Sequence, residues 1–186
     1  MITISDSQLE RYRHLLCLLV RRLPRDRRAQ ARYDPSDIVQ EVLLKAHKNL
    51  ANFRGETEAE LFKWLQTILE REVIAFWRRH HADKVDPARE RQLQHDLAQS
   101  SACIESYLAD KELSPSEQAV RNELLLKLAW AIEQLPEDQR DVVILRDQGG
   151  LSVAEIAEQL GRSQKSVAGL LLRGRRRLRE LLAEYQ

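Results

Sequence analysis

The chain has 186 residues, of which 43% are hydrophobic and 32% charged, and its formal net charge is +1. No apolar run approaches the ~20 residues of a membrane-spanning helix, so we expect no membrane insertion. The first residues lack a secretory signal pattern, and Cys17 and Cys103 lie far apart and outside any CxxC pair. We therefore expect a cytoplasmic protein with reduced thiols, long enough for two small domains.

The first helices are predicted from apolar spacing and from proline. Residues 8–23 carry apolar side chains three and four positions apart, which predicts one helix. Pro35 opens a second helix, and Ser36 or Asp37 is the expected N-cap.

A third helix is predicted to begin near Glu58 and to run to about His80, because Thr57 and Glu60 form a capping-box pattern. Glu72 falls inside the apolar arc of this helix, and the sequence does not identify a partner for it. Three helices with short breaks predict an all-α first domain over residues 5–84.

Residues 85–113 show weak periodicity and a slightly acidic composition. Leu93 and Leu97 could begin a short helix. A flexible linker is the preferred interpretation of this stretch.

Ser114 and Glu117 form another capping-box pattern, which opens a fourth helix that Pro136 ends. A further helix is expected over about Glu137–Asp147, followed by two glycines. The fourth helix carries an apolar stripe of Val120, Leu124, Leu128, Ala131 and Leu135.

The segment from Leu151 to Leu182 predicts a helix-turn-helix. A small residue, Ala157, lies in its first helix, Gly161 lies in the turn, and Val167 lies on the second helix. Close crossing needs the small residue, and the turn needs a glycine with positive φ. The second domain, residues 114–186, is therefore predicted to be four helices, and the whole chain to be all-α.

The second helix of this motif is strongly basic. Seven cations and no acid lie between Gly161 and Arg179, which favours DNA binding over a plain helical hairpin. Its expected outward face contains Gly169, where the backbone can approach DNA closely, and Leu172, which either meets a thymine methyl or contacts the protein itself. The DNA-binding candidates here are Ser163, Lys165, Ser166, Gly169, Leu172, Arg173 and Arg176.

The first domain interleaves aromatic residues with cations, a pattern that suits stacking of unpaired bases. The alternative is that the aromatic residues are core, and this alternative is strong for Phe62 and Phe76. The candidates are Arg54, Lys63, Arg71, Trp77, Arg78 and Arg79.

Asp37, Gln40 and Glu41 form one polar patch on the second helix, with Leu44 beside it, outside the buried stripe. Such a face is either merely solvated or a docking surface.

No catalytic constellation, cofactor motif or metal-ligand spacing occurs, and adjacent His80 and His81 do not face one metal. We therefore expect a protein that is not an enzyme and has no cofactor.

The order of three segments along the chain is informative: DIVQEVLLKAHKNLANFRG comes first, then LFKWLQTILEREVIAFWRRH, and then LPEDQRDVVILRDQGGLSVAEIAEQLGRSQKSVAGLLLRGRRRL. Their combination resembles a bacterial RNA polymerase sigma factor of the sigma-70 family, of the extracytoplasmic-function type with regions 2 and 4. The resemblance covers nearly the whole chain outside residues 85–113.

The resemblance implies a role for each surface. Asp37, Gln40, Glu41 and Leu44 match the part that docks on the β′ clamp helices of core RNA polymerase, and the β flap is a further expected contact. Asn52–Glu60 with Leu61–Arg79 matches the part that melts and captures the promoter −10 element. Ser163–Arg177 matches the reader of the −35 element. Family members are often held by an anti-sigma protein, and the sequence leaves this open here.

Two departures from the family pattern stand out. Arg71 replaces a usual asparagine, and Ala168, Gly169 and Leu170 replace usual polar or basic residues. The alternative function is a stand-alone helix-turn-helix regulator whose N-terminal helices form a sensor or dimerisation domain.

Overall fold

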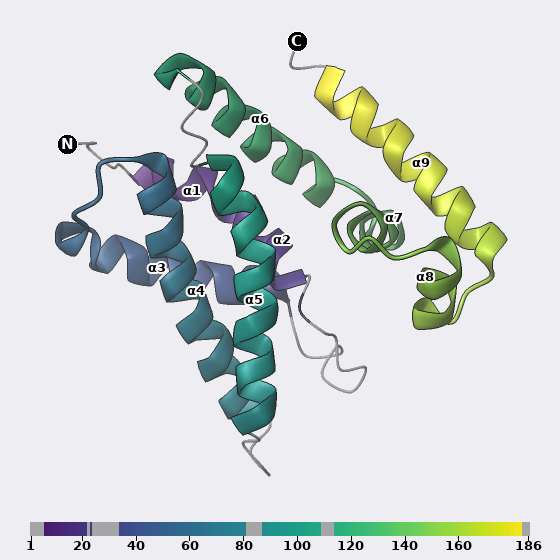
Figure 1. Ribbon diagram of the computed structural model, residues 1–186, viewed down its shortest axis with the longest axis horizontal. Coiled ribbons are helices and arrows are strands. Elements are labelled where there is room, and N and C mark those ends of the chain that lie inside the picture. Colours follow the sequence, from purple (N-terminus) through teal and green to yellow (C-terminus); the bar gives the residue numbers. More distant parts are fainter. Residues whose placement is uncertain (1–5, 22, 24–33, 81–86, 109–113, 184–186) are drawn as a thin grey trace. The chain divides into compact units, whose positions relative to one another are not determined.

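The computed structural model (Figure 1) contains only helices among the residues that it describes, with no strand, which confirms the predicted all-α class. The chain divides into two units, residues 1–126 and 127–186. The dividing point lies within helix α6 (Pro115–Glu133). The described residues are 6–21, 23, 34–80, 87–108 and 114–183.

The first unit is a helical bundle whose largest fully buried side chains include Phe62, Leu16, Leu19 and Leu65. A 3-10 turn over Leu50–Asn52 follows its third helix. Its helices are α1 (Asp6–Arg11), α2 (Arg13–Arg21), α3 (Pro35–Lys48), α4 (Glu58–His80), α5 (Pro87–Leu108) and the beginning of α6.

The single helix expected over residues 8–23 is two helices that meet at Tyr12. Tyr12 is buried, and its ring stacks on Phe62 with centroids 6.1 Å apart. The hydroxyl of Tyr12 donates to Glu58, whose pKa is raised by burial. Apolar spacing could not locate this break, because Leu9, Tyr12, Leu16 and Leu19 keep their three-four spacing across it and are all buried.

Helix α3 is capped by Asp34 and not by Ser36 or Asp37. The Asp34 carboxylate accepts the backbone N–H of Ser36 at 2.9 Å, and Pro35 occupies the first turn. Proline lacks an N–H and suits the first helical position, so the cap moves to the residue before it.

Helix α4 begins and ends where the sequence predicted, and its capping box is present. Glu60 N–H donates to Thr57 Oγ1 at 3.2 Å, and Thr57 N–H donates to Glu60 Oε2 at 3.0 Å. Glu72 is buried, and Lys45 on α3 is its partner, with Nζ 2.5 Å from Oε1. The ion pair joins α3 to α4 and explains a charge within the apolar arc.

Residues 87–108 form helix α5 where the sequence predicted a flexible linker. Leu93 and Leu97 are buried, and α5 packs against α4 and α2. Two leucines four positions apart are too weak a pattern to predict a helix alone, but a neighbouring helix pair completes their burial.

The second unit contains the end of α6, then α7 (Glu137–Val143), a π turn over Ile144–Gln148, α8 (Val153–Leu160) and α9 (Gln164–Ala183). Val142, Ile156 and Val167 are fully buried at its centre. Gly174 on α9 lies against α7: a Cβ there would approach Val143 Cγ2 to 3.0 Å. A small residue at this point allows α7 and α9 to pack closely.

No helix among the residues placed by the structure combines the length and the apolar character needed to cross a membrane.

Candidate functional site

Helices α8 and α9 form the predicted helix-turn-helix. Ser152 and Glu155 complete a capping box at the start of α8, and Gly161 ends α8 with φ of +64°. Ser163 caps α9, its Oγ accepting the N–H of Ser166 at 3.2 Å. Ala157 and Val167 are buried, as predicted.

The outward face of α9 lies opposite its buried residues Val167, Leu170, Leu171, Gly174 and Leu178. Lys165, Arg173 and Arg176 are exposed, and Leu172 is 68% exposed, so Leu172 makes no protected contact within its unit. A Cβ at Gly169 would meet only the flexible end of Arg173, at 3.4 Å. Packing among the described residues therefore does not require glycine at position 169.

The fold brings acids to four of the seven cations that the sequence leaves unopposed. Three acids from outside the 161–179 stretch are involved, and one of them serves two arginines. The pairs are Arg162–Asp138 at 2.7 Å, Arg175–Asp147, Arg176–Glu180 at 3.1 Å and Arg177–Glu180 at 3.3 Å.

These pairs differ in what they join. Glu180 lies on α9 with Arg176 and Arg177, and the two guanidinium groups, Arg177 first, lower the pKa of its carboxyl. Asp147 lies on the π turn, and its hydrogen bond raises the pKa of Arg175. Among the described residues, Lys165 and Arg173 make no ion pair.

The loop before α4 is tightly packed around Gly55. The ring of Phe53 lies 5.2 Å from that of Trp64, and Arg54 Nη1 donates to Ala51 O at 2.9 Å. A Cβ at Gly55 would lie 2.3 Å from Phe53 Cζ and 2.9 Å from Glu60 Cβ. The loop therefore holds one shape and presents an exposed Arg54.

Helix α4 carries Lys63, Arg71 and Arg78 on one exposed face. Arg78 is also bound to Glu90 of α5 at 2.8 Å. Trp77 is half-buried and flanks this face, and Arg79 is exposed with its Nε on Ala75 O at 3.3 Å. The structure thus brings together most of the predicted cations on α4.

The predicted patch on α3 is a continuous exposed strip. Asp37, Gln40 and Glu41 are exposed, and Leu44 is 46% exposed at the next turn of the same face. The described residues supply no hydrogen bond or ion pair to these four side chains. An exposed apolar side chain next to polar groups without partners is compatible with a docking surface.

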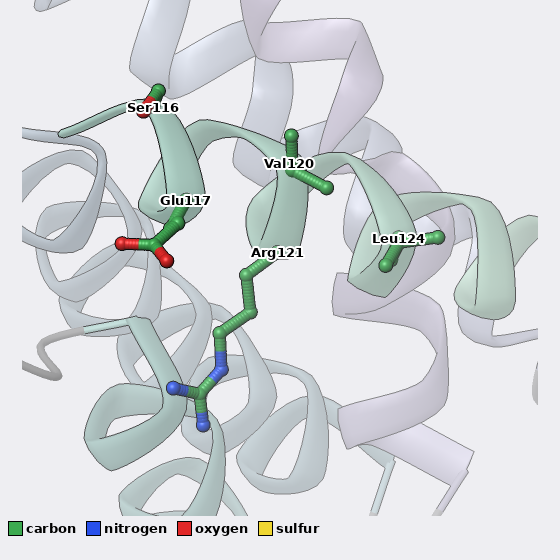
Figure 2. A pocket seen from close by; sticks show the side chains of 5 residues that line it. All are labelled: Ser116, Glu117, Val120, Arg121 and Leu124. Carbon is green, nitrogen blue, oxygen red and sulfur yellow. The ribbon is translucent and has the colours of Figure 1, made fainter. Parts of the chain in front are cut away.

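Helix α6 exposes part of the apolar stripe that the sequence showed. Ala131 is buried, but Val120 is 62% exposed, Leu124 56% and Leu128 39%. In Figure 2, Val120 and Leu124 project from α6 beside a surface hollow also lined by Ser116, Glu117 and Arg121. Periodicity identifies an apolar strip but not whether the chain itself covers it.

Comparisons with known proteins match both units. Residues 9–83 match the family described as Sigma-70 region 2, and residues 125–178 match Sigma-70, region 4. The chain is 33% identical to the ECF RNA polymerase sigma-E factor of Escherichia coli K12 over 156 residues, which cover 79% of this chain and 70% of that protein. It is 30% identical to the RNA polymerase sigma-H factor of Pseudomonas aeruginosa over 157 residues, 82% of this chain and 72% of that one.

One solved structure, of the sigma factor RpoE in complex with the anti-sigma factor NepR from Bartonella quintana, is 25% identical with a TM-score of 0.35. The match covers 97% of this chain and 98% of that one.

Proposed function

The chain belongs to the sigma-70 family of RNA polymerase sigma factors, extracytoplasmic-function type, and on this premise we propose how its surfaces divide the work of promoter-specific initiation. Helix α3 docks on core RNA polymerase. The loop before α4 and the outer face of α4 capture the −10 element, and α9 reads the −35 element. The polymerase supplies the chemistry, and this chain supplies recognition.

The observation that carries the proposal is the division of α9 into two faces. One face is buried in the helix-turn-helix. The other presents half-buried Gly169 and exposed Leu172, together with exposed Lys165, Arg173 and Arg176. A helix whose N-terminal half enters the major groove needs base-facing atoms in that half and cations that reach the phosphates. Ser163, as the cap of α9, and Ser166 hold the helix end that enters the groove.

For the −10 element we assign Arg54 and the cations of α4 to the DNA backbone. Lys63, Arg71 and Arg78 share one face, so a single strand laid along α4 meets them in turn. Trp77, half-buried beside that face, is the aromatic residue that we assign to stacking with an unpaired base. Arg79 extends the positive surface toward the end of the helix.

For polymerase docking we assign Asp37, Gln40, Glu41 and Leu44 to the β′ clamp helices. The strip combines exposed polar side chains with one exposed apolar side chain at its end, a mixture typical of small protein interfaces. Two DNA contacts mounted on one enzyme then reinforce each other through effective concentration.

Run-off transcription with purified core polymerase tests the proposal. Core with this chain is expected to give discrete transcripts from genomic fragments, whereas core alone gives none. Absence of both core binding and directed initiation would favour the stand-alone regulator.

Arg176→Ala is expected to weaken promoter binding across different promoter sequences and to reduce the salt slope. The side chain is 78% exposed, and among the described residues its ion-pair partner is Glu180, one turn along the same helix. One lost phosphate contact lowers the slope of log K against log salt by about 0.9. Filter binding from 50 to 300 mM salt measures it; an altered sequence preference with an unchanged slope would contradict the phosphate assignment.

Gly169→Ala is expected to move stability and binding in opposite directions. Alanine should stabilise α9 by about 0.5–1 kcal/mol, because the helix position has room for a Cβ. If DNA approaches the bare backbone here, the same methyl should reduce −35 binding about tenfold, or ~1.4 kcal/mol. Thermal unfolding and duplex binding measure the two effects, with Ala168→Gly as the control expected to lower stability. Unchanged binding would refute close approach at position 169.

A further inference from the structure

We propose that Arg175 and Asp147 are a positioning pair that fixes the rotation of α9 about its own axis. On this inference, which rests on the proposed function above, Arg175 sets which side chains face the −35 bases and is not itself a phosphate contact. The pair would thereby control sequence discrimination, while other arginines of α9 supply affinity.

The pair joins two separate elements. Arg175 Nε lies 3.3 Å from Asp147 Oδ2, and Arg175 Nη2 also donates to Asp147 Oδ1, so a planar guanidinium faces a planar carboxylate. A two-point contact of this kind fixes orientation as well as distance. By contrast, the pairs of Arg176 and Arg177 with Glu180 stay within α9 and cannot orient it.

The π turn that presents Asp147 is itself firmly held. Gly149 N–H donates to Ile144 O at 3.0 Å, Leu151 N–H to Leu145 O at 3.2 Å, and Arg146 Nη1 to Leu151 O at 2.8 Å. These bonds fix the backbone on both sides of Asp147.

Glycine is required at this turn. A Cβ at Gly149 would lie 2.6 Å from Leu145 O, and Gly150 has φ of +68°. The turn requires two glycines and contains the extra residue of a π turn, so its conformation is specified by the sequence. Such π turns recur at functional positions. Asp147 is therefore a fixed point against which α9 can be oriented.

Arg175 lies at the edge of the buried face of α9. It follows buried Gly174 and stands four positions after buried Leu171, so it is turned about 90° from the centre of the outward face. Arg176 and Leu172 lie near that centre. A guanidinium at the border between the buried and outward faces, bound to a neighbouring element, restrains rotation of α9. A rotation of about 20° would displace all base-facing side chains together.

Binding of the holoenzyme to two duplexes tests the inference. One duplex carries the −35 sequence that wild-type holoenzyme selects from a randomised library, and the other carries that sequence scrambled. The variants are Arg175→Gln, Asp147→Asn and the exchange Asp147→Arg with Arg175→Asp. Arg175→Lys is the conservative variant, and Arg176→Gln is the matched control for loss of one charge.

We expect Arg175→Gln and Asp147→Asn each to lower the ratio of selected to scrambled affinity at least fivefold, with an unchanged salt slope. The exchange and Arg175→Lys should restore most of the wild-type ratio of selected to scrambled affinity. Arg176→Gln should lower the slope of log K against log salt by about 0.9 and leave the affinity ratio unchanged. Thermal unfolding of each variant, with the assay run well below its midpoint, separates loss of fold from loss of orientation.

Two results would overturn the inference. A lowered slope in Arg175→Gln with its ratio intact makes Arg175 a phosphate contact. Tighter binding of Asp147→Asn to both duplexes would mean that Asp147 neutralises Arg175, which otherwise contacts a phosphate. Failure of wild-type holoenzyme to select any sequence refutes the proposed function instead, which distinguishes the two ideas.

Discussion

Gly55→Ala is expected to abolish most promoter opening while leaving core binding and −35 binding near wild type. The added methyl would lie 2.3 Å from Phe53 Cζ and 2.9 Å from Glu60 Cβ. The Phe53 ring is held by Trp64, and Glu60 is held as the cap of α4, so neither can move freely. Overpacking of this kind costs about 1–3 kcal/mol.

The cap of α4 makes this loop sensitive. Glu60 Oε2 accepts the N–H groups of Glu56 and Thr57 at 2.7 and 3.0 Å, bonds that lower the pKa of Glu60. Displacing Glu60 Cβ weakens these bonds and shifts Arg54 with the loop. If the loop captures an unpaired base, a loss of about 2 kcal/mol in that step lowers open-complex formation about 30-fold.

Permanganate reactivity of unpaired thymines in the holoenzyme–promoter complex measures the effect. Ala51→Ser adds one atom at an exposed position of the same loop and should open promoters normally. Combining Gly55→Ala with Phe53→Leu should recover part of the opening, because the smaller side chain leaves room. Normal opening by Gly55→Ala alone would show that the shape of this loop is unimportant.

The features predicted correctly from the sequence are those whose cause lies within a few residues. The capping boxes at Thr57 and Ser152 and the left-handed Gly161 need no information from the rest of the chain. The helix-turn-helix followed from them, because its caps, turn and buried Val167 agree with one another.

Apart from the Asp34 cap of α3, which is local, most features that the sequence did not predict depend on partners far along the chain. Glu72 needed Lys45, 27 positions away, and Arg175 needed Asp147, 28 positions away. Helix α5 likewise depends on packing against α4, which the weak apolar spacing within α5 does not predict. A count of cations along the chain likewise did not show that Arg162 and Arg175 are paired with acids of other elements.

The exposure of many candidate residues agrees with the sequence, whereas their roles stay predictions. The strip on α3 is exposed, and so are Lys165, Leu172, Arg173 and Arg176 on α9. The sequence did not separate arginines that orient the fold from those free to meet phosphates, because the acids that distinguish them come from other elements. The ion pairs therefore distinguish these two groups of arginines, which the net charge cannot do.

Leu44→Asp is expected to lower affinity for core polymerase about 30-fold or more, with little change in the fold. Leu44 is the 46% exposed apolar residue of the α3 strip, so an aspartate there is hydrated in the free chain. Helix propensity alone costs about 0.5 kcal/mol. Docking would bury the new carboxylate without a partner, and an unpaired charge at an interface centre costs at least ~2 kcal/mol.

Leu172→Asp is the matched control, because Leu172 is an exposed leucine of α9 and 68% accessible. It should leave core affinity unchanged and weaken −35 binding through repulsion from DNA. Fluorescence anisotropy of labelled chain titrated with core measures the first affinity, and circular dichroism checks helix content.

Gln40→Ala with Glu41→Ala should act in the same direction as Leu44→Asp but more weakly, since polar side chains at an interface contribute less than apolar ones. Equal core affinity for Leu44→Asp and Leu172→Asp would show that this strip does not contact the polymerase, and loss of helix content in Gln40→Ala with Glu41→Ala would make the strip structural.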